Sequence, residues 1–147
     1  MNDLYSVSEV KMTYETKVKK KVKVNTSMKI YKLMLQNWEQ IEYRETFKIL
    51  LLDRATQALG INTVAMGGVS ETTVDIRMVL QAALLANASS IVCVHNHPSG
   101  NWLPSNGDDL VTYKIWKAAK ILDIEMVDHL IITNCGYYSY ADCGRFN

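Results

Sequence analysis

The chain has 147 residues, of which 16 are Lys or Arg and 15 are Asp or Glu, so its formal net charge is +1. This length corresponds to one domain large enough to bury a hydrophobic core, and the near-neutral balance gives the whole molecule no nucleic-acid or membrane signature. No apolar stretch reaches the length of a membrane span, and the first residues lack the apolar region of a signal peptide. We therefore expect a single domain over residues 1–147 and no membrane partner.

The N-terminal stretch, residues 7–26, partly alternates between polar and apolar residues and is rich in β-branched side chains, which predicts one or two strands. Five lysines lie between Lys17 and Lys23. The favoured interpretation is an edge strand whose lysines discourage pairing with other chains. The alternative is a basic patch that follows nucleic-acid phosphates, although no aromatic residues are interleaved with these lysines.

Helical and strand patterns alternate along the rest of the chain. The expected helices, whose apolar residues recur every three or four positions, cover residues 28–42, 73–87 and 106–122. The expected strands cover residues 45–53, 61–67, 90–94, 125–133 and 137–140, the second ending at Gly67-Gly68 and the last two forming a hairpin. The helix at 73–87 is apolar over most of its surface, so we expect it to be deeply buried. This order of elements indicates a three-layer α/β domain with a mixed sheet.

The cysteines favour a reducing compartment. Cys93, Cys135 and Cys143 are odd in number and form no C-x-x-C pair, which fits a cytoplasmic protein better than a disulfide framework. Cys93 lies inside an apolar run and is interpreted as a small core residue.

Two histidines directly follow the apolar run 90–94. Residues i and i+2 of an extended chain point to the same face, so His95 and His97 converge on one point while Asn96 faces away. Asp108 falls in the first turn of the next expected helix, where it approaches the same point. Two imidazoles and one carboxylate, with a fourth position left to water, match the ligand count of a catalytic zinc site.

These residues also have structural interpretations. An isolated His-x-His pair is more often two hydrogen-bonded structural histidines than a metal site. Ser105 and Asp108 fit a capping box at the start of a helix, a role compatible with metal binding because one Asp108 oxygen suffices for the ion. Asp109 is the rival ligand, but its side chain projects about a quarter turn away around the helix.

Hydrolysis by a metal-activated water also needs a base that takes and returns a proton, and the segment around the histidines supplies none. Glu45 is the best candidate because it shares a strand face with Phe47, Ile49 and Leu51. The alternative is that Glu45 has no catalytic role and is simply a solvated carboxylate at the end of a strand. The pattern alone leaves both interpretations open.

Taken together, these motifs resemble the JAMM (MPN+) metalloproteases, also known as JAB-domain proteins. The matching residues are His95-Asn96-His97-Pro98-Ser99-Gly100, Ser105, Asp108 and Thr112, with Glu45-x-Phe47-x-x-Leu50-x-Leu52-Asp53 upstream and Val74–Arg77 and Asp128–Ile132 as flanking signatures. The string HNHPSG…PS…D…T is similar to the RadC branch of that family. The resemblance covers residues 41–140, the part of the chain that carries the motifs.

The resemblance implies a cytidine-deaminase-like α/β/α fold and one zinc ion per chain. His95, His97 and Asp108 would bind the zinc, Glu45 would be the general base, and Ser105 would stabilise the oxyanion during attack on an amide or isopeptide carbonyl. The substrate would be a peptide or protein that the motif does not identify. For Asp128 and His129, a hydrogen-bonded strand pair beside the site is favoured over contact with a zinc histidine.

Two functions are compatible with this resemblance. The favoured one is a zinc-dependent metallohydrolase, because every catalytic position is present. The other is a DNA-repair accessory or DNA-binding module with a non-catalytic metal site, which would bind DNA through the lysine stretch in a salt-sensitive way. Full-length RadC-like proteins carry an N-terminal helix-hairpin-helix region, and the absence of a comparable region from this sequence counts against direct DNA binding.

Two other classes of metal enzyme are excluded by the pattern. Zinc deaminases need H-x-E with P-C-x-x-C, whereas this chain has His-x-His and no paired cysteines. HNH nucleases spread their residues over a ββ–metal–α unit, whereas these residues lie together at one strand end.

Overall fold

The computed structural model describes residues 6–67 and 73–146, so Gly68 and both ends of the expected domain lie outside the described residues. Within that part the elements in chain order are α1 (Ser27–Gln36), β1 (Thr46–Leu52), β2 (Ala58–Met66), α2 (Ile76–Leu85), β3 (Ser90–Asn96), α3 (Asn106–Ile121), β4 (Glu125–Ile132) and β5 (Tyr137–Ser139). None of these helices is both long and apolar enough to cross a membrane.

The described strands form one mixed sheet in the order β2-β1-β3-β4-β5. β1 is antiparallel to both β2 and β3, and β4 and β5 form the expected hairpin. β3 and β4 are parallel, with α3 as the connection between them. A parallel pair requires such a crossover, because the chain must return to the starting end of the sheet.

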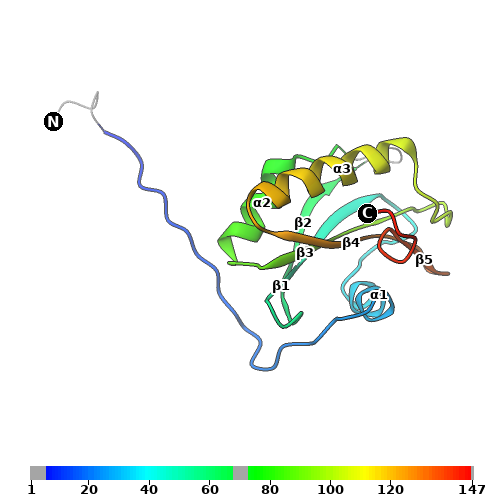
Figure 1. The fold of residues 1–147 in the computed structure, drawn as a ribbon, viewed down its shortest axis with the longest axis horizontal. Coiled ribbons are helices and arrows are strands. Elements are labelled where there is room, and N and C mark those ends of the chain that lie inside the picture. Colours follow the sequence, from blue (N-terminus) through cyan, green and yellow to red (C-terminus); the bar gives the residue numbers. More distant parts are fainter. Residues whose placement is uncertain (1–5, 68–72, 147) are drawn as a thin grey trace.

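Helices cover both faces of this sheet, as Figure 1 shows. α2 and α3 lie on one face, where Phe47, Ile49 and Leu51 of β1 contribute to their core. Leu50 and Leu52 point to the other face and pack against α1. Alternate residues of a strand face opposite sides, so a strand buried on both faces is apolar at nearly every position. The expected three-layer α/β/α domain with a mixed sheet is confirmed.

The strands expected over residues 7–26 are wrong. Residues 6–22 form an extended arm that leads away from the domain (Figure 1), and the only pairing recorded for the described part of this stretch is an isolated bridge between Lys23 and Gln57. Val7 and Val10 remain 93% and 84% exposed. The alternating pattern supplies a potential apolar face, but a strand is stabilised only when that face has something to cover it. Four of the five lysines, namely Lys17, Lys19, Lys20 and Lys21, therefore lie on an exposed arm and not on an edge strand, and Lys23 forms the isolated bridge.

α2 is shorter and less buried than expected. Asp75 is its N-cap, with a side chain that accepts a hydrogen bond from the Arg77 amide, so the helix begins after residue 73. Only Val79 and Ala83 are fully buried along it, whereas other apolar side chains are exposed, namely Met78, Leu84 and Leu85. An outer-layer helix buries one face, and the composition of α2 does not reveal which of its apolar residues remain in solvent.

Candidate metal centre

β3 and the segment after it orient the two histidines. β3 is buried along its whole length, and His95 lies opposite Phe47 of β1 on the face covered by α2 and α3. His97 follows the strand, and its amide donates to the carbonyl of Ile132. The alternation places both imidazoles on the same side of the sheet, as the sequence predicts.

Asn96 points to the opposite side and holds the segment that precedes β1. Its side-chain oxygen accepts a hydrogen bond from the Thr46 amide at 2.7 Å. Its amide group donates to the carbonyls of Ile41 and Arg44 at 2.7 and 2.8 Å. Glu45 lies between two of these anchored residues, so Asn96 fixes the position of the backbone that carries Glu45. The sequence pattern indicates only that Asn96 faces away from the histidines.

The structure brings the four expected residues together. His95 Nε2 lies 3.0 Å from His97 Nε2 and 3.1 Å from Asp108 Oδ1. His97 Nε2 lies 3.3 Å from Asp108 Oδ2, and Glu45 Oε1 lies 3.9 Å from His95 Nε2. One potential ligand atom from each residue falls within 4.8 Å of all the others. Residues separated by some fifty positions in the chain therefore form one cluster.

The donor set fits a metal ion. Two ligands of a tetrahedral zinc ion, each 2.0–2.1 Å from the metal, lie about 3.3 Å apart. The separations among His95, His97 and Asp108 are close to this value. The His97 Nδ1–H donates to the Asn101 carbonyl at 2.7 Å, which leaves the Nε2 lone pair directed at the cluster.

The electrostatics keep Asp108 ionised. Burial raises the pKa of this carboxyl group, but the imidazoles of His95 and His97, which can donate to it when they are protonated, outweigh burial and hold the pKa far below its usual range. Burial lowers the pKa of His97, but the hydrogen bonds that its protonated ring makes to Asp108 and Asn101 raise the pKa overall. An ionised carboxylate is the form that binds a metal ion.

Ser105 and Asp108 form the expected capping box at the start of α3. The Asp108 amide donates to Ser105 Oγ at 3.1 Å, and the Ser105 amide donates to Asp108 Oδ2 at 2.8 Å. This reciprocal pair orients the carboxylate and leaves Oδ1 toward His95. Asp108 therefore takes part in the capping box and in the cluster at the same time, as expected from the sequence.

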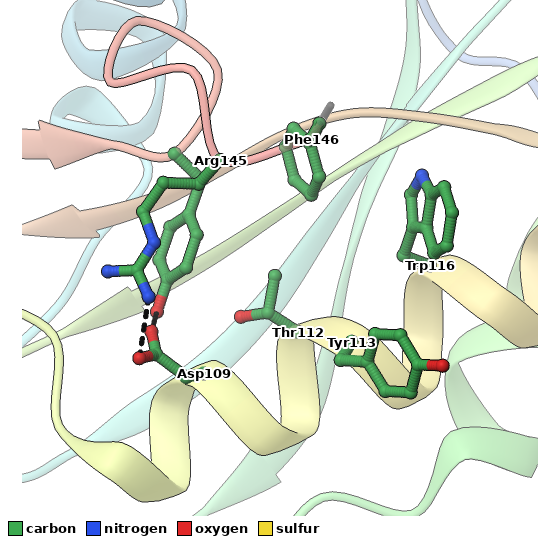
Figure 2. A pocket seen from close by; sticks show the side chains of 7 residues that line it. Asp109, Thr112, Tyr113, Trp116, Arg145 and Phe146 are labelled. Atoms are coloured by element: carbon green, nitrogen blue, oxygen red, sulfur yellow. Dashed lines mark hydrogen bonds and ion pairs between the residues drawn. The ribbon is translucent and has the colours of Figure 1, made fainter.

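Asp109 is not part of the cluster. Figure 2 shows its carboxylate turned toward Arg145, in a second pocket on another side of α3. Arg145 Nη2 donates to Asp109 Oδ2 at 2.6 Å, and the Tyr140 hydroxyl donates to Oδ1 at 2.7 Å. One step along the helix was enough to separate the two carboxylates, which favours Asp108 as the ligand.

Comparison with known protein families agrees with the fold. The model of the RadC-like JAB domain family matches residues 24–145. The chain belongs to the RadC-like JAB domain family. The match leaves out the extended arm before residue 24.

Relatives of this JAB domain are UPF0758 proteins. The chain is 38% identical to one from Thermotoga maritima over 123 residues, covering 84% of this chain and 54% of that protein. It is 34% identical to one from Pasteurella multocida over 142 residues, covering 97% of this chain and 59% of that protein. The chain thus spans little more than half the length of these relatives, and their names state no activity.

The JAB domain places Glu45 and Ser105 in the same pocket as the three expected ligands. This pocket has a volume of about 330 Å³ and is lined by Glu45, Phe47, Thr73, Val74, His95, His97, Ser105, Gly107, Asp108 and Val111. Polar groups of the cluster therefore lie beside apolar side chains of β1 and α3, a combination typical of ligand sites.

Asp128 and His129 have different roles in this JAB domain. Asp128 accepts hydrogen bonds from the His129 and Ala141 amides and from the Ser139 hydroxyl, so it joins β4 to the turn after β5. His129 reaches the cluster instead, because its Nε2 lies 2.8 Å from His95 Nδ1. Burial lowers the pKa of His129 well below its usual value, and the nearby His95 lowers it further. The favoured interpretation of a simple strand pair therefore holds for Asp128 but not for His129.

Proposed function

We propose that this JAB domain is a zinc-dependent metallohydrolase that cleaves an amide or isopeptide bond in a peptide or protein. The observation that carries the proposal is the convergence of Glu45 with a two-histidine, one-carboxylate cluster in a single pocket. A site that only bound a metal would not require a carboxylate beside its ligands. Glu45 directly precedes β1, and the buried side chain of Asn96 holds the backbone on both sides of it through Arg44 and Thr46.

His95, His97 and Asp108 would hold the ion through Nε2, Nε2 and a carboxylate oxygen. When bound, zinc acidifies a water molecule and polarises the carbonyl of the substrate. Glu45 would accept the proton of the attacking water at a carboxylate oxygen and return it to the leaving amine. The distance of 3.9 Å between Glu45 Oε1 and His95 Nε2 supports this role.

Ser105 would stabilise the negative charge that develops on the carbonyl oxygen. Its Oγ accepts a hydrogen bond from the Asp108 amide, so the hydroxyl hydrogen is available as a donor. Ser105 lines the pocket, and a donor already in place beside the substrate needs little rearrangement when the charge appears.

The test is Glu45→Gln, which retains the shape of the side chain and removes the base. We expect one zinc ion per chain in both proteins and a loss of hydrolysis of about 10²–10⁴-fold on a panel of peptide and isopeptide substrates. Glu39→Gln, which changes an exposed acid on the loop before β1, is the matched control and should leave both properties unchanged. Zinc-free wild-type protein, or hydrolysis that Glu45→Gln does not reduce, would contradict the proposal.

A further inference from the structure

A line of buried hydrogen bonds connects His95 with the first turns of α3. His95 Nδ1 lies 2.8 Å from His129 Nε2, and His129 Nδ1 lies 2.5 Å from Thr112 Oγ1. Thr112 Oγ1 in turn lies 2.6 Å from the backbone carbonyl oxygen of Asp108. The linking residues, His129 and Thr112, are 0% and 4% exposed, so water does not compete for these contacts.

The chemistry of the last acceptor fixes the direction of every bond in this line. A carbonyl oxygen carries no hydrogen, so the Thr112 hydroxyl must donate to Asp108 and its oxygen must accept from His129 Nδ1–H. A neutral imidazole has one N–H, so His129 Nε2 must accept the hydrogen of His95 Nδ1. His95 is then left with a lone pair on Nε2, the atom that faces His97 and Asp108.

We propose that Thr112 and His129 are positioning residues that hold His95 in the tautomer and ring orientation required of a metal ligand. This inference rests on the proposed metal site and adds to it the residues that prepare one ligand. The line ends on the backbone of Asp108, whose side chain is another proposed ligand. Two ligands from separate elements, β3 and α3, are therefore held in register by one internal connection.

Packing alone does not explain a histidine at position 129. Its ring stacks on Tyr140 at a centroid distance of 5.1 Å and meets the edge of Phe47 at 5.5 Å. A phenylalanine would preserve both ring contacts and would avoid burying two polar nitrogens. Only the hydrogen bonds to His95 and Thr112 require an imidazole, so they distinguish a positioning role from a packing role.

The experiment compares pairs of variants that differ in hydrogen bonding. His129→Phe and Thr112→Val remove links and should weaken zinc binding by about 10–100-fold, the usual effect of losing a group that supports a ligand. His129→Gln restores an acceptor for His95, and Thr112→Ser restores the hydroxyl, so both should bind zinc nearly as tightly as the wild type. Zinc affinity is measured by competition with a chromogenic chelator, and folding is checked by circular dichroism.

A second measurement does not depend on metal. ¹⁵N NMR of the metal-free wild-type protein should show the hydrogen of His95 on Nδ1 only, and His129→Phe should give a mixture of both tautomers. Hydrogen on Nε2 in the wild type would overturn the inference even if a variant failed to fold. Unchanged zinc affinity in folded His129→Phe and Thr112→Val would also overturn it. Wild-type protein that shows the expected tautomer but binds no zinc would contradict the metallohydrolase instead.

Discussion

Ser105 caps α3 and is also the proposed oxyanion donor, and the loss of each role would have a different measurable effect. As the N-cap of α3 it accepts the Asp108 amide, and replacing such a residue with alanine costs about 1 kcal/mol of stability. As an oxyanion donor it would contribute about 10²–10³-fold to kcat. The two effects can be measured separately, because the loss of the helix cap lowers the free energy of unfolding and the loss of the oxyanion donor lowers kcat.

We expect Ser105→Ala to lower the free energy of unfolding by about 1 kcal/mol and to reduce kcat by about 10²-fold or more. Ser105→Thr keeps a hydroxyl and should preserve most of both properties. The measurements are urea denaturation and steady-state hydrolysis of the zinc-loaded protein. A destabilised Ser105→Ala variant with wild-type kcat would restrict Ser105 to helix capping.

The cluster could be predicted from local spacing, whereas its supporting residues could not. His95 and His97 are two apart on a strand, and Asp108 lies in the first turn of the following helix, so their convergence follows from the periodicity of those elements. His129 reaches His95 only because β3 and β4 pair in parallel with Cys93 opposite His129. No spacing in the sequence encodes that register. The contact therefore becomes visible only in three dimensions.

Among the elements, the loop before β1 has the clearest link to function. Asn96 is fully buried and satisfies three backbone groups of this loop and of the β1 start. Removing a partner from a buried donor or acceptor costs about 1–3 kcal/mol for each group left unsatisfied. The same change would release the backbone on both sides of Glu45.

We therefore expect Asn96→Ala to lower the free energy of unfolding by about 3 kcal/mol or more. The rate of hydrolysis should fall by a larger factor than zinc affinity. The backbone around Glu45 loses its hydrogen bonds to Asn96, whereas the contacts of the proposed metal ligands do not involve the Asn96 side chain. Asn62→Ala, at an exposed position of β2, is the control for the substitution itself. Denaturation, chelator competition and kcat together check the expectation, and an equal loss of zinc affinity and activity would contradict it.

At the scale of elements, the sequence is sufficient where burial and periodicity agree. The run from Ser90 is apolar and short, so β3 follows from composition alone. The N-terminal stretch has the alternation of a strand, yet in the described part of the chain it pairs only through the bridge between Lys23 and Gln57. The pattern carries no information about neighbouring strands. The apolar character of α2 likewise overestimates its burial, because its outward face remains in solvent.

For the whole molecule, the arm is the part least connected to the domain. Its described contacts with the domain include the Tyr14 hydroxyl on the Leu59 carbonyl at 2.7 Å and Lys21 Nζ at 3.4 Å from Asp53 Oδ2. Exposed contacts of this kind contribute little to stability. The arm also carries four of the five lysines on which the alternative DNA-binding function depends.

Replacing Lys17, Lys19 and Lys20 with glutamine should leave stability within about 0.5 kcal/mol of the wild type, since all three are exposed. Zinc binding and hydrolysis should also be unchanged. Thermal unfolding, chelator competition and fluorescence anisotropy with duplex DNA at two salt concentrations provide the measurements. Salt-sensitive DNA binding by the wild type that disappears in the variant, with no hydrolysis in either protein, would favour the DNA-binding function.

The connection between β3 and α3 also has a consequence for the order in which the site forms during folding. The three proposed ligands lie between His95 and Asp108, so only a short loop must close to bring them together. Glu45 reaches the site only when β1 pairs with β3. This contact joins segments about fifty residues apart, so the entropy cost of closing the loop is larger than for the segment between His95 and Asp108. In stopped-flow refolding with a zinc-sensitive dye, we expect metal capture to precede the recovery of hydrolysis, so that refolding passes through a metal-loaded state without its base.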